Sequence, residues 1–314
     1  MTLVIGTDEA GYGPNLGPLV VAATAWRVPA ASCPEAHLGT VAADVGRSAK
    51  LTGLPWADSK QMYKPGGGLA ALERGVLATL TQSPGDGAAL AARLGLDVGL
   101  GETGAPPEWP RFLAMKLPRG ATAAEIARLA EAVALVLPRH DMELVAVACR
   151  VVHPGPFNAL LEAGLNKSDI LSRTTLDLAA ALRDLAPDEQ AAVWCDRHGG
   201  RKAYAPLVGR HFGAALVQTL EETPARSRYA IPANRLQIEF AVGGESRVPV
   251  ALASMTAKYV RELSMAAFND HWGERCPGLQ PTAGYPVDAR RWREEADRAV
   301  CAEGIPAGML WRRA

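Results

Sequence analysis

Short apolar runs alternate with amphipathic stretches along this chain, and their order predicts an α/β sheet. Within residues 2–28, a strand leads through a glycine-rich turn into a second apolar strand at 19–26, which indicates a hairpin-like start. Further strands are predicted at 143–152, 191–194 and 235–242, and helices at 69–80, 122–137, 154–161, 168–185, 204–220 and 249–268. Because helices separate the later strands, we expect them to cover both faces of the sheet.

Two stretches rich in glycine, proline and alanine interrupt this order. Residues 29–56 are expected to form an excursion, and residues 82–120 an inserted loop or small lobe. The tail, from Pro281 onward, contains an arginine-rich helix. With 314 residues, 48% of them hydrophobic, the chain is long enough to bury a sizeable core.

Charge and cysteine content restrict how this protein could bind nucleic acid and argue against zinc sites and disulfides. The 33 basic and 33 acidic residues balance, so nucleic acid would have to bind a local basic stripe rather than the whole surface. The five cysteines form no Cys-x-x-Cys pair, which argues against a structural zinc site or a disulfide framework. No apolar run approaches the roughly 18 residues of a membrane span. We therefore expect a cytoplasmic monomer that makes no contact with membranes.

Acidic residues stand where predicted strands end. Asp8 and Glu9 close the first strand, Asp196 follows the run 191–194, and Glu262 lies on the predicted helix 249–268. Together these four carboxylates could hold two Mg²⁺ or Mn²⁺ ions, which prefer oxygen ligands. Each also has a simpler interpretation, because a strand-end acid pair is often a solvated turn. Glu262 could equally be an exposed helix residue paired with a neighbouring cation.

A glycine-rich loop, Gly11-Tyr12-Gly13-Pro14-Asn15-Leu16-Gly17, follows the acid pair. Its spacing differs from a dinucleotide-binding fingerprint, and no Gly-Lys-Ser/Thr follows as in a phosphate-binding P-loop. The loop could offer backbone N–H groups to one sugar-phosphate unit beside the carboxylates. A tight turn between two strands would explain the same residues.

Five segments, taken in order, resemble type 2 ribonuclease H, the ribonuclease HII family. They are Asp8-Glu9-Ala10-Gly11-Tyr12-Gly13, Asp58-Ser59-Lys60, Trp194-Cys195-Asp196, the run from Ala253 to Glu262, and Gly284-Tyr285-Pro286. The chain departs from the family pattern at two of these positions. Tyr12 stands where the family has Arg, and Glu262 where it has Asp. The resemblance is therefore to a divergent member.

The resemblance implies a ribonuclease H-like mixed sheet flanked by helices, with inserted loops and a C-terminal helical extension. It divides the chain into a catalytic domain, residues 1–270, and an extension, residues 271–314, that packs on it. The implied metal ligands and catalytic residues are Asp8, Glu9, Asp196 and Glu262, with Mg²⁺ or Mn²⁺ as cofactor. The implied substrate-binding residues are Gly11, Tyr12 and Gly13 as a cradle for the ribose 2′-hydroxyl, Lys60, Arg201, Lys202 and Lys258 at phosphates, and Tyr285 on the sugar.

The implied activity is two-metal-ion cleavage of the RNA strand of an RNA:DNA hybrid, or of a ribonucleotide embedded in duplex DNA. Two other hypotheses stay open at this point. One is a nuclease of the same fold that does not discriminate ribose. The other is a nucleic-acid-binding protein whose catalytic site is weakened by the change to Glu262.

Overall fold

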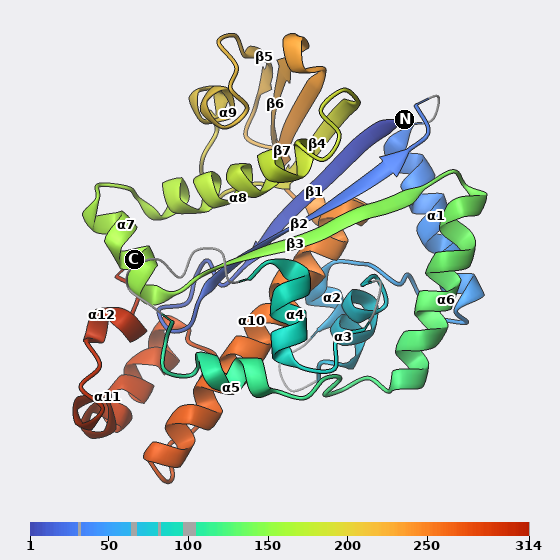
Figure 1. The fold of residues 1–314 in the computed structure, drawn as a ribbon. Coiled ribbons are helices and arrows are strands. Elements are labelled where there is room, and N and C mark those ends of the chain that lie inside the picture. Colours follow the sequence, from blue (N-terminus) through green and yellow to red (C-terminus); the bar gives the residue numbers. More distant parts are fainter. Residues whose placement is uncertain (31–32, 64–67, 81–82, 97–104, 314) are drawn as a thin grey trace.

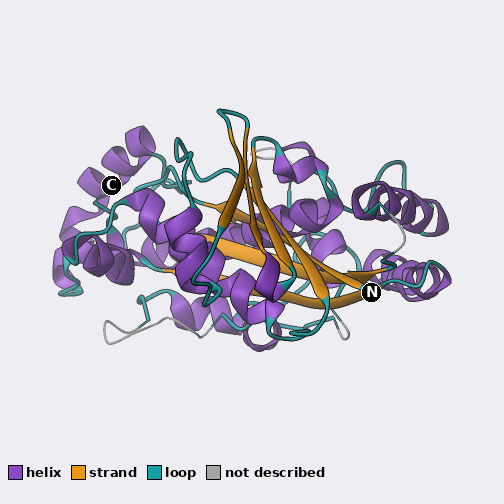
Figure 2. Ribbon diagram, turned by 90° about the horizontal axis from the view of Figure 1, so that it is seen from above, coloured by secondary structure: helices purple, strands orange, loops and turns teal. Residues whose placement is uncertain are grey.

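A single mixed sheet runs through the middle of the molecule, with helices on both sides (Figure 1 and Figure 2). The structure is a computed structural model that describes residues 1–30, 33–63, 68–80, 83–96 and 105–313. Parts of both predicted insertions, residues 31–32, 82 and 97–104, lie outside the described residues. The seven strands of the described part have the order β3-β2-β1-β4-β7-β6-β5. Their bounds are β1 Thr2–Ala10, β2 Leu19–Val28, β3 Glu143–Val152, β4 Gln190–Asp196, β5 Gln218–Glu222, β6 Arg226–Ile231 and β7 Leu236–Ala241.

The three central strands are parallel, and this sets the position of the site. β1 pairs in parallel with β4, and β4 pairs in parallel with β7. The remaining pairs are antiparallel, including the predicted hairpin of β1 with β2. Because β1, β4 and β7 run in one direction, their carboxyl ends meet at one edge of the sheet, where ligands of such sheets bind.

Most predicted helices form close to their predicted bounds. The described helices are α1 Pro34–Ser48, α2 Ser59–Met62, α3 Ala70–Leu77, α4 Gly87–Leu94, α5 Trp109–Ala114, α6 Ala123–Arg139, α7 Pro154–Glu162, α8 Lys167–Arg183, α9 Ala205–His211, α10 Val248–Arg275, α11 Pro286–Ala302 and α12 Ala307–Leu310, with 3₁₀ turns η1 Pro232–Asn234 and η2 Gly244–Ser246. The predicted excursion and lobe thus contain helices, α1 in the first and α4 and α5 in the second. None of the described helices is long and apolar enough to cross a membrane.

The predicted helix 204–220 is wrong in its second half. The helix ends at His211, and Gly213 adopts a left-handed conformation (φ 61°), which an L side chain disfavours and which commonly ends helices. The chain then enters β5, which pairs with β6 across a turn closed by Thr223 and Arg226. Neither strand of this hairpin was predicted from the sequence.

Each face of the sheet has its own apolar core. On one face, Val4 and Trp26 of the sheet pack with helices that include α1, α3, α6 and α10. On the other face, Leu3 and Ile5 pack with α7, α8 and α9. The alternation of Leu3, Val4 and Ile5 between the two cores follows from the two-residue period of a strand. Gly6 completes the packing, because a Cβ atom there would lie 2.2 Å from the Pro249 carbonyl carbon of α10.

The C-terminal region packs on the far end of α10. This helix continues unbroken across residue 270. Phe268 and Trp272, near its end, form a third apolar cluster with Trp292 of α11 and Leu310 of α12. Helices α11 and α12 therefore pack on the apolar side chains at the end of α10, and Figure 1 shows them on the same side of the molecule as α7.

Glu73 of α3 joins the lobe to α10. Its side chain is fully buried and accepts hydrogen bonds from the backbone N–H groups of Arg119, Gly120 and Ala121 at 2.5–2.8 Å. The Tyr259 hydroxyl of α10 donates a fourth hydrogen bond at 2.7 Å. One buried carboxylate thus organises the turn into α6 and fixes it to the helix that carries part of the site.

We expect Glu73→Gln to destabilise the fold by about 2–4 kcal/mol, because the amide group brings a buried N–H₂ against a set of donors. The free energy of unfolding from urea titration measures this effect. The matched control is Glu131→Gln on the exposed face of α6, which should change stability by less than about 0.5 kcal/mol. Equal effects of the two substitutions would contradict the anchoring role of Glu73.

Candidate active site

Three of the predicted carboxylates meet at the carboxyl edge of the parallel strands. Asp8 and Glu9 lie near the end of β1, and Asp196 is the last residue of β4. Thr7 pairs with Cys195 in the sheet, so Asp8 and Asp196 follow side by side on neighbouring strands. The Glu9 backbone N–H donates to Asp8 Oδ1 at 2.8 Å, which orients the buried Asp8 carboxyl group.

A fourth carboxylate, Glu245, completes the cluster. It lies in η2, the short turn that follows β7, the third parallel strand, after Val242 and Gly243. The Gly244 N–H donates to Asp196 Oδ1 at 3.1 Å, so the turn that carries Glu245 is bound directly to the end of β4. The turn approaches the strand closely because Gly244 has no side chain: a Cβ atom there would lie only 3.3 Å from the Asp196 Cα. Glu245 was not predicted from the sequence, because it stands in a turn beyond its strand, whereas Asp8 and Asp196 belong to the strands themselves.

Glu262 is not brought into this cluster, contrary to the sequence-based prediction. It lines a separate groove of about 530 Å³ with Tyr63, Arg119 and Thr282. The Lys258 ammonium pairs with its carboxylate at 2.7 Å from one helical turn earlier, and the Tyr63 hydroxyl donates to it at 2.8 Å. The ion pair with Lys258 agrees with the alternative interpretation, but Glu262 is half-buried and not an exposed helix residue.

The Asp58-Ser59-Lys60 segment supports the carboxylates from the side. Asp58 caps α2 by accepting a hydrogen bond from the Lys60 backbone N–H at 2.9 Å. The Ser59 hydroxyl is hydrogen-bonded to the Ser254 hydroxyl at 2.9 Å, and Ser254 in turn hydrogen-bonds the Asp8 side chain. The Lys60 ammonium pairs with Glu245 at 2.9 Å while its side chain stays 80% exposed. This motif thus places one exposed cation beside the acidic cluster.

The four carboxyl groups perturb one another strongly. Burial raises the pKa of Asp8 to about 7, and the charge of Asp196 adds to the effect. Burial and the charge of Glu245 raise the pKa of Asp196 to about 6. The pKa of Glu9 is also raised, by burial and by the charges of Asp8 and Asp196. Burial also acts on Glu245, but hydrogen bonds and the Lys60 ammonium outweigh it and lower the pKa of this residue.

The oxygen atoms of these carboxylates are suitable ligands for a divalent metal ion. Oxygen donors near the ends of three neighbouring strands match the preference of Mg²⁺ and Mn²⁺, and a bound cation would offset the burial and the mutual repulsion that raise the pKa values of Asp8, Glu9 and Asp196. Within the described ranges, no three His, Cys, Asp or Glu side chains are already arranged to hold a metal ion. Side-chain rotation would therefore have to accompany metal binding.

The glycine loop lies beside the carboxylates. Gly11 has a left-handed backbone (φ 86°), and a Cβ atom there would lie 2.5 Å from the Pro18 carbonyl oxygen. The Tyr12 ring lies 4.8 Å below the Lys167 ammonium, and a Cβ atom at Gly199 would lie 3.3 Å from its hydroxyl. Burial and the charge of Glu9 raise the pKa of Tyr12, so this side chain extends from the loop toward the acidic cluster.

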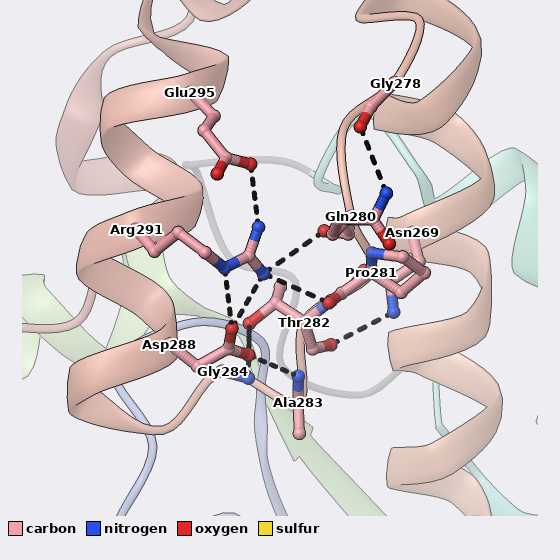
Figure 3. Close-up of polar contacts among 10 residues, drawn as sticks. All are labelled: Asn269, Gly278, Gln280, Pro281, Thr282, Ala283, Gly284, Asp288, Arg291 and Glu295. Carbon is pink, nitrogen blue, oxygen red and sulfur yellow. Dashed lines mark hydrogen bonds and ion pairs between the residues drawn. The ribbon is translucent and has the colours of Figure 1, made fainter.

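Tyr285 stands next to this loop, exposed to solvent. A Cβ atom at Gly13 would lie 3.8 Å from its ring, and the Gly284 carbonyl accepts hydrogen bonds from the Asn15 and Leu16 N–H groups at 2.8 and 3.2 Å. Figure 3 shows how the preceding loop is held between α10 and α11. Asp288 accepts from the Thr282 hydroxyl at 2.5 Å, and Asn269 and Thr282 exchange two hydrogen bonds. A polar network thus fixes an exposed aromatic ring beside the glycine loop.

The predicted phosphate-binding cations occupy different surroundings. Lys60 pairs with Glu245, Lys258 with Glu262, and Arg201 with Asp169 of α8. Lys202 is exposed, and its carbonyl oxygen accepts a hydrogen bond from the Ser227 hydroxyl at 2.6 Å. Arg201 also lies close enough to Tyr12 to act on its hydroxyl electrostatically. Lys60 and Arg201 therefore flank the carboxylates and the loop, whereas Lys258 belongs to the separate groove.

The raised pKa values make stability depend on pH in a defined direction. Asp8 and Asp196 retain protons in the folded state that the unfolded chain releases above about pH 4, so metal-free stability should fall as the pH rises from about 4 to 7. Asp8→Asn should therefore melt higher than the wild type near pH 8, by about 3 °C or more in EDTA, with a smaller difference near pH 5. Differential scanning fluorimetry at both pH values tests this, and a difference independent of pH would contradict it.

No protein-family model matches the sequence, and no curated protein is similar to it. Among solved structures, the chain is similar to one in the PCNA:RNase HII complex from Archaeoglobus fulgidus, with 17% identity, a TM-score of 0.48 and coverage of 99% of this chain and 94% of that one. The ribonuclease H2 from Pyrococcus horikoshii matches with 14% identity, a TM-score of 0.46 and coverage of 98% and 92%. Bst-RNase HIII in complex with Mn²⁺ matches with 16% identity, a TM-score of 0.44 and coverage of 99% and 66%.

Each of these three structures contains a ribonuclease HII, H2 or HIII. At such identities and TM-scores the likeness assigns no activity to this chain. The function proposed below therefore depends on the chain's own residues.

Proposed function

We propose that this protein is a metal-dependent endonuclease that hydrolyses the RNA strand of RNA:DNA hybrids, or ribonucleotides embedded in duplex DNA. The observation that carries the proposal is the meeting of Asp8, Glu9, Asp196 and Glu245 at the ends of three parallel strands. Four mutually repelling carboxyl groups are costly to the fold, and such clusters are typical of sites that bind metal ions. With Mg²⁺ or Mn²⁺ bound, the site would supply Lewis-acid activation of water and of the scissile phosphate.

The chain's own residues would bind and orient the nucleic acid. Asp8 and Asp196, side by side on β1 and β4, define where the scissile phosphate must lie. The glycine loop next to them offers backbone N–H groups to the ribose, whose 2′-hydroxyl both donates and accepts hydrogen bonds. The exposed Tyr285 ring beside Gly13 offers an apolar surface to the sugar. Lys60 and Arg201 supply positive charge on either side of the cluster.

Cleavage of three duplexes of one sequence tests the proposal. The protein is incubated with Mg²⁺ or Mn²⁺ and an RNA:DNA hybrid, a DNA duplex with one embedded ribonucleotide, or an all-DNA duplex. We expect cleavage of one or both ribose-containing substrates and none of the all-DNA duplex. Equal cleavage of all three would favour a nuclease that does not discriminate ribose. Binding without cleavage in either metal would overturn the proposed activity.

A further inference from the structure

The last residues of the chain lie against the glycine loop. The Arg312 side chain is 1% exposed, and its Nη2 donates to the Gly11 carbonyl oxygen at 2.6 Å and also to the Pro14 carbonyl oxygen. The Arg312 backbone N–H donates to the Asn15 carbonyl oxygen at 2.8 Å, and Asn15 Nδ2 donates to the Arg312 carbonyl oxygen at 3.1 Å. A bridge between Leu16 and Trp311 extends the contact. Residues 311–313, the C-terminal segment, therefore pair with the loop along its length.

Asn158 of α7 holds the C-terminal segment in place. Its buried Nδ2 donates to the carbonyl oxygens of Gly308 and Trp311 at 2.8 and 2.7 Å. Its Oδ1 accepts from the Arg313 backbone N–H at 2.9 Å. Because one side chain satisfies three backbone groups, the segment is fixed relative to the sheet before any substrate binds.

Burying the Arg312 guanidinium lowers the stability of the fold more than a packing contact alone would require. In the part of the chain that the structure describes, its Nε and Nη1 have no hydrogen-bond partner and no carboxylate pairs with it, although its guanidinium lies 5.2 Å from the centre of the Phe157 ring. Burial and the nearby charge of Arg261 lower its pKa to about 9. A buried cation without a counter-ion destabilises a fold, so an uncharged side chain would serve simple packing better. Such costs concentrate at functional sites.

The contacts with Arg312 determine which backbone groups of the loop stay available. The carbonyl oxygens of Gly11 and Pro14 face the guanidinium, and the N–H groups of Asn15 and Leu16 donate to Gly284. The N–H groups of Tyr12 and Gly13 have no such partner among the residues described. Neighbouring free N–H groups above a buried positive charge attract hydrogen-bond acceptors and anions.

We propose that Arg312 is a positioning residue of the substrate site: it holds the glycine loop with the N–H groups of Tyr12 and Gly13 presented to the ribose hydroxyl and the phosphate beside it. The C-terminal segment thus completes a site whose catalytic carboxylates lie on the strands. This inference rests on the proposed function for the identity of the ligand, but the contact with the loop does not depend on it.

Three variants test this role: Arg312→Met, Arg312→Lys and the matched control Arg313→Met, whose exposed side chain pairs with Glu162. For Arg312→Met we expect KM for the ribonucleotide-containing duplex to rise about 10–100-fold, the effect of losing hydrogen bonds from a charged group, with kcat changed only a few-fold. The stabilisation by Mn²⁺ in thermal melts should be unchanged, and hydrogen exchange of residues 11–16 should accelerate. Arg312→Lys should recover part of the lost affinity, and Arg313→Met should behave as the wild type.

Two results would overturn the inference. One is a wild-type KM together with unchanged exchange of residues 11–16 in Arg312→Met. The other is a rise in KM that is accompanied by loss of the stabilisation by Mn²⁺ and by faster exchange across the whole chain, which indicates a general structural role. If the wild type cuts no ribose-containing duplex, the proposed function fails. Exchange of residues 11–16 in Arg312→Met then still decides whether Arg312 holds the loop.

Discussion

Replacing Asp8 by Asn should abolish hydrolysis while leaving the protein folded. We expect kcat to fall by at least about 10³-fold, because the Asp8 carboxylate lies centrally among the four and an amide cannot supply its charge. The affinity for an RNA:DNA hybrid should fall much less, since the glycine loop and the flanking cations are untouched. Gel-based cleavage under single-turnover conditions, together with fluorescence-anisotropy binding, separates the two effects.

The folded state provides the control for this substitution. Removing a buried carboxyl group whose pKa is raised to about 7 should stabilise the metal-free protein above neutral pH, so lost activity cannot be attributed to unfolding. Residual cleavage within about tenfold of the wild type would show that Asp8 holds no essential role. Such a result would remove the observation on which the proposed function depends.

The paired substitutions Glu245→Gln and Glu262→Gln should have opposite outcomes. Both remove one carboxylate charge with almost no change of shape. Glu245 belongs to the cluster at the strand ends, so we expect its substitution to lower kcat by about 10²–10³-fold and to weaken the stabilisation by Mn²⁺. Glu262 is bound by Lys258 and Tyr63 in a separate groove, so its substitution should change kcat by less than about fivefold.

Cleavage rates at several Mn²⁺ concentrations distinguish a lower affinity for the metal from a slower cleavage step in each variant. A severe loss of kcat in Glu262→Gln with a mild loss of kcat in Glu245→Gln would restore the ligand set expected from the sequence alone. Equal and severe losses would require both residues to act, and the groove around Glu262 would then belong to the site. The matched chemistry of the two substitutions makes the comparison direct.

The sequence predicted the parts of the site that follow from strand periodicity. Asp8 and Asp196 each come directly at the end of an apolar run, and parallel pairing of β1 with β4 places them together as expected. This prediction succeeded because the backbone direction of a buried strand fixes the position of the residue that follows it. The same reasoning places the glycine loop, which begins one residue after β1 ends.

The fourth carboxylate could not be chosen in the same way. Glu245 stands beyond the end of β7, in a short turn whose direction depends on the hydrogen bond from Gly244 to Asp196. No local pattern encodes that contact. The sequence did contain a cue against Glu262, because Lys258 lies four residues before it on a helix and pairs readily at that spacing. Local helix geometry was therefore a better guide here than the order of motifs.

Other differences also arise from long-range contacts. The hairpin of β5 and β6 replaces part of a predicted helix, since Gly213 ends α9 and edge pairing with β7 then stabilises the strands. The contact of Arg312 with Gly11 joins residues at opposite ends of the chain. Neither contact leaves a periodic signature, so composition and spacing alone do not reveal them.

The three parallel strands are separated by long stretches of sequence, and this has a consequence for biosynthesis. Of the three parallel strands, β1 is synthesised first, whereas β4 and β7 begin only at Gln190 and Leu236. Until then the apolar surface of the first strand lacks its permanent cover, and pairing across such distances is slow. Nascent chains released early would thus carry no assembled catalytic centre, so a premature stop in translation should yield an inert product instead of an unregulated hydrolase.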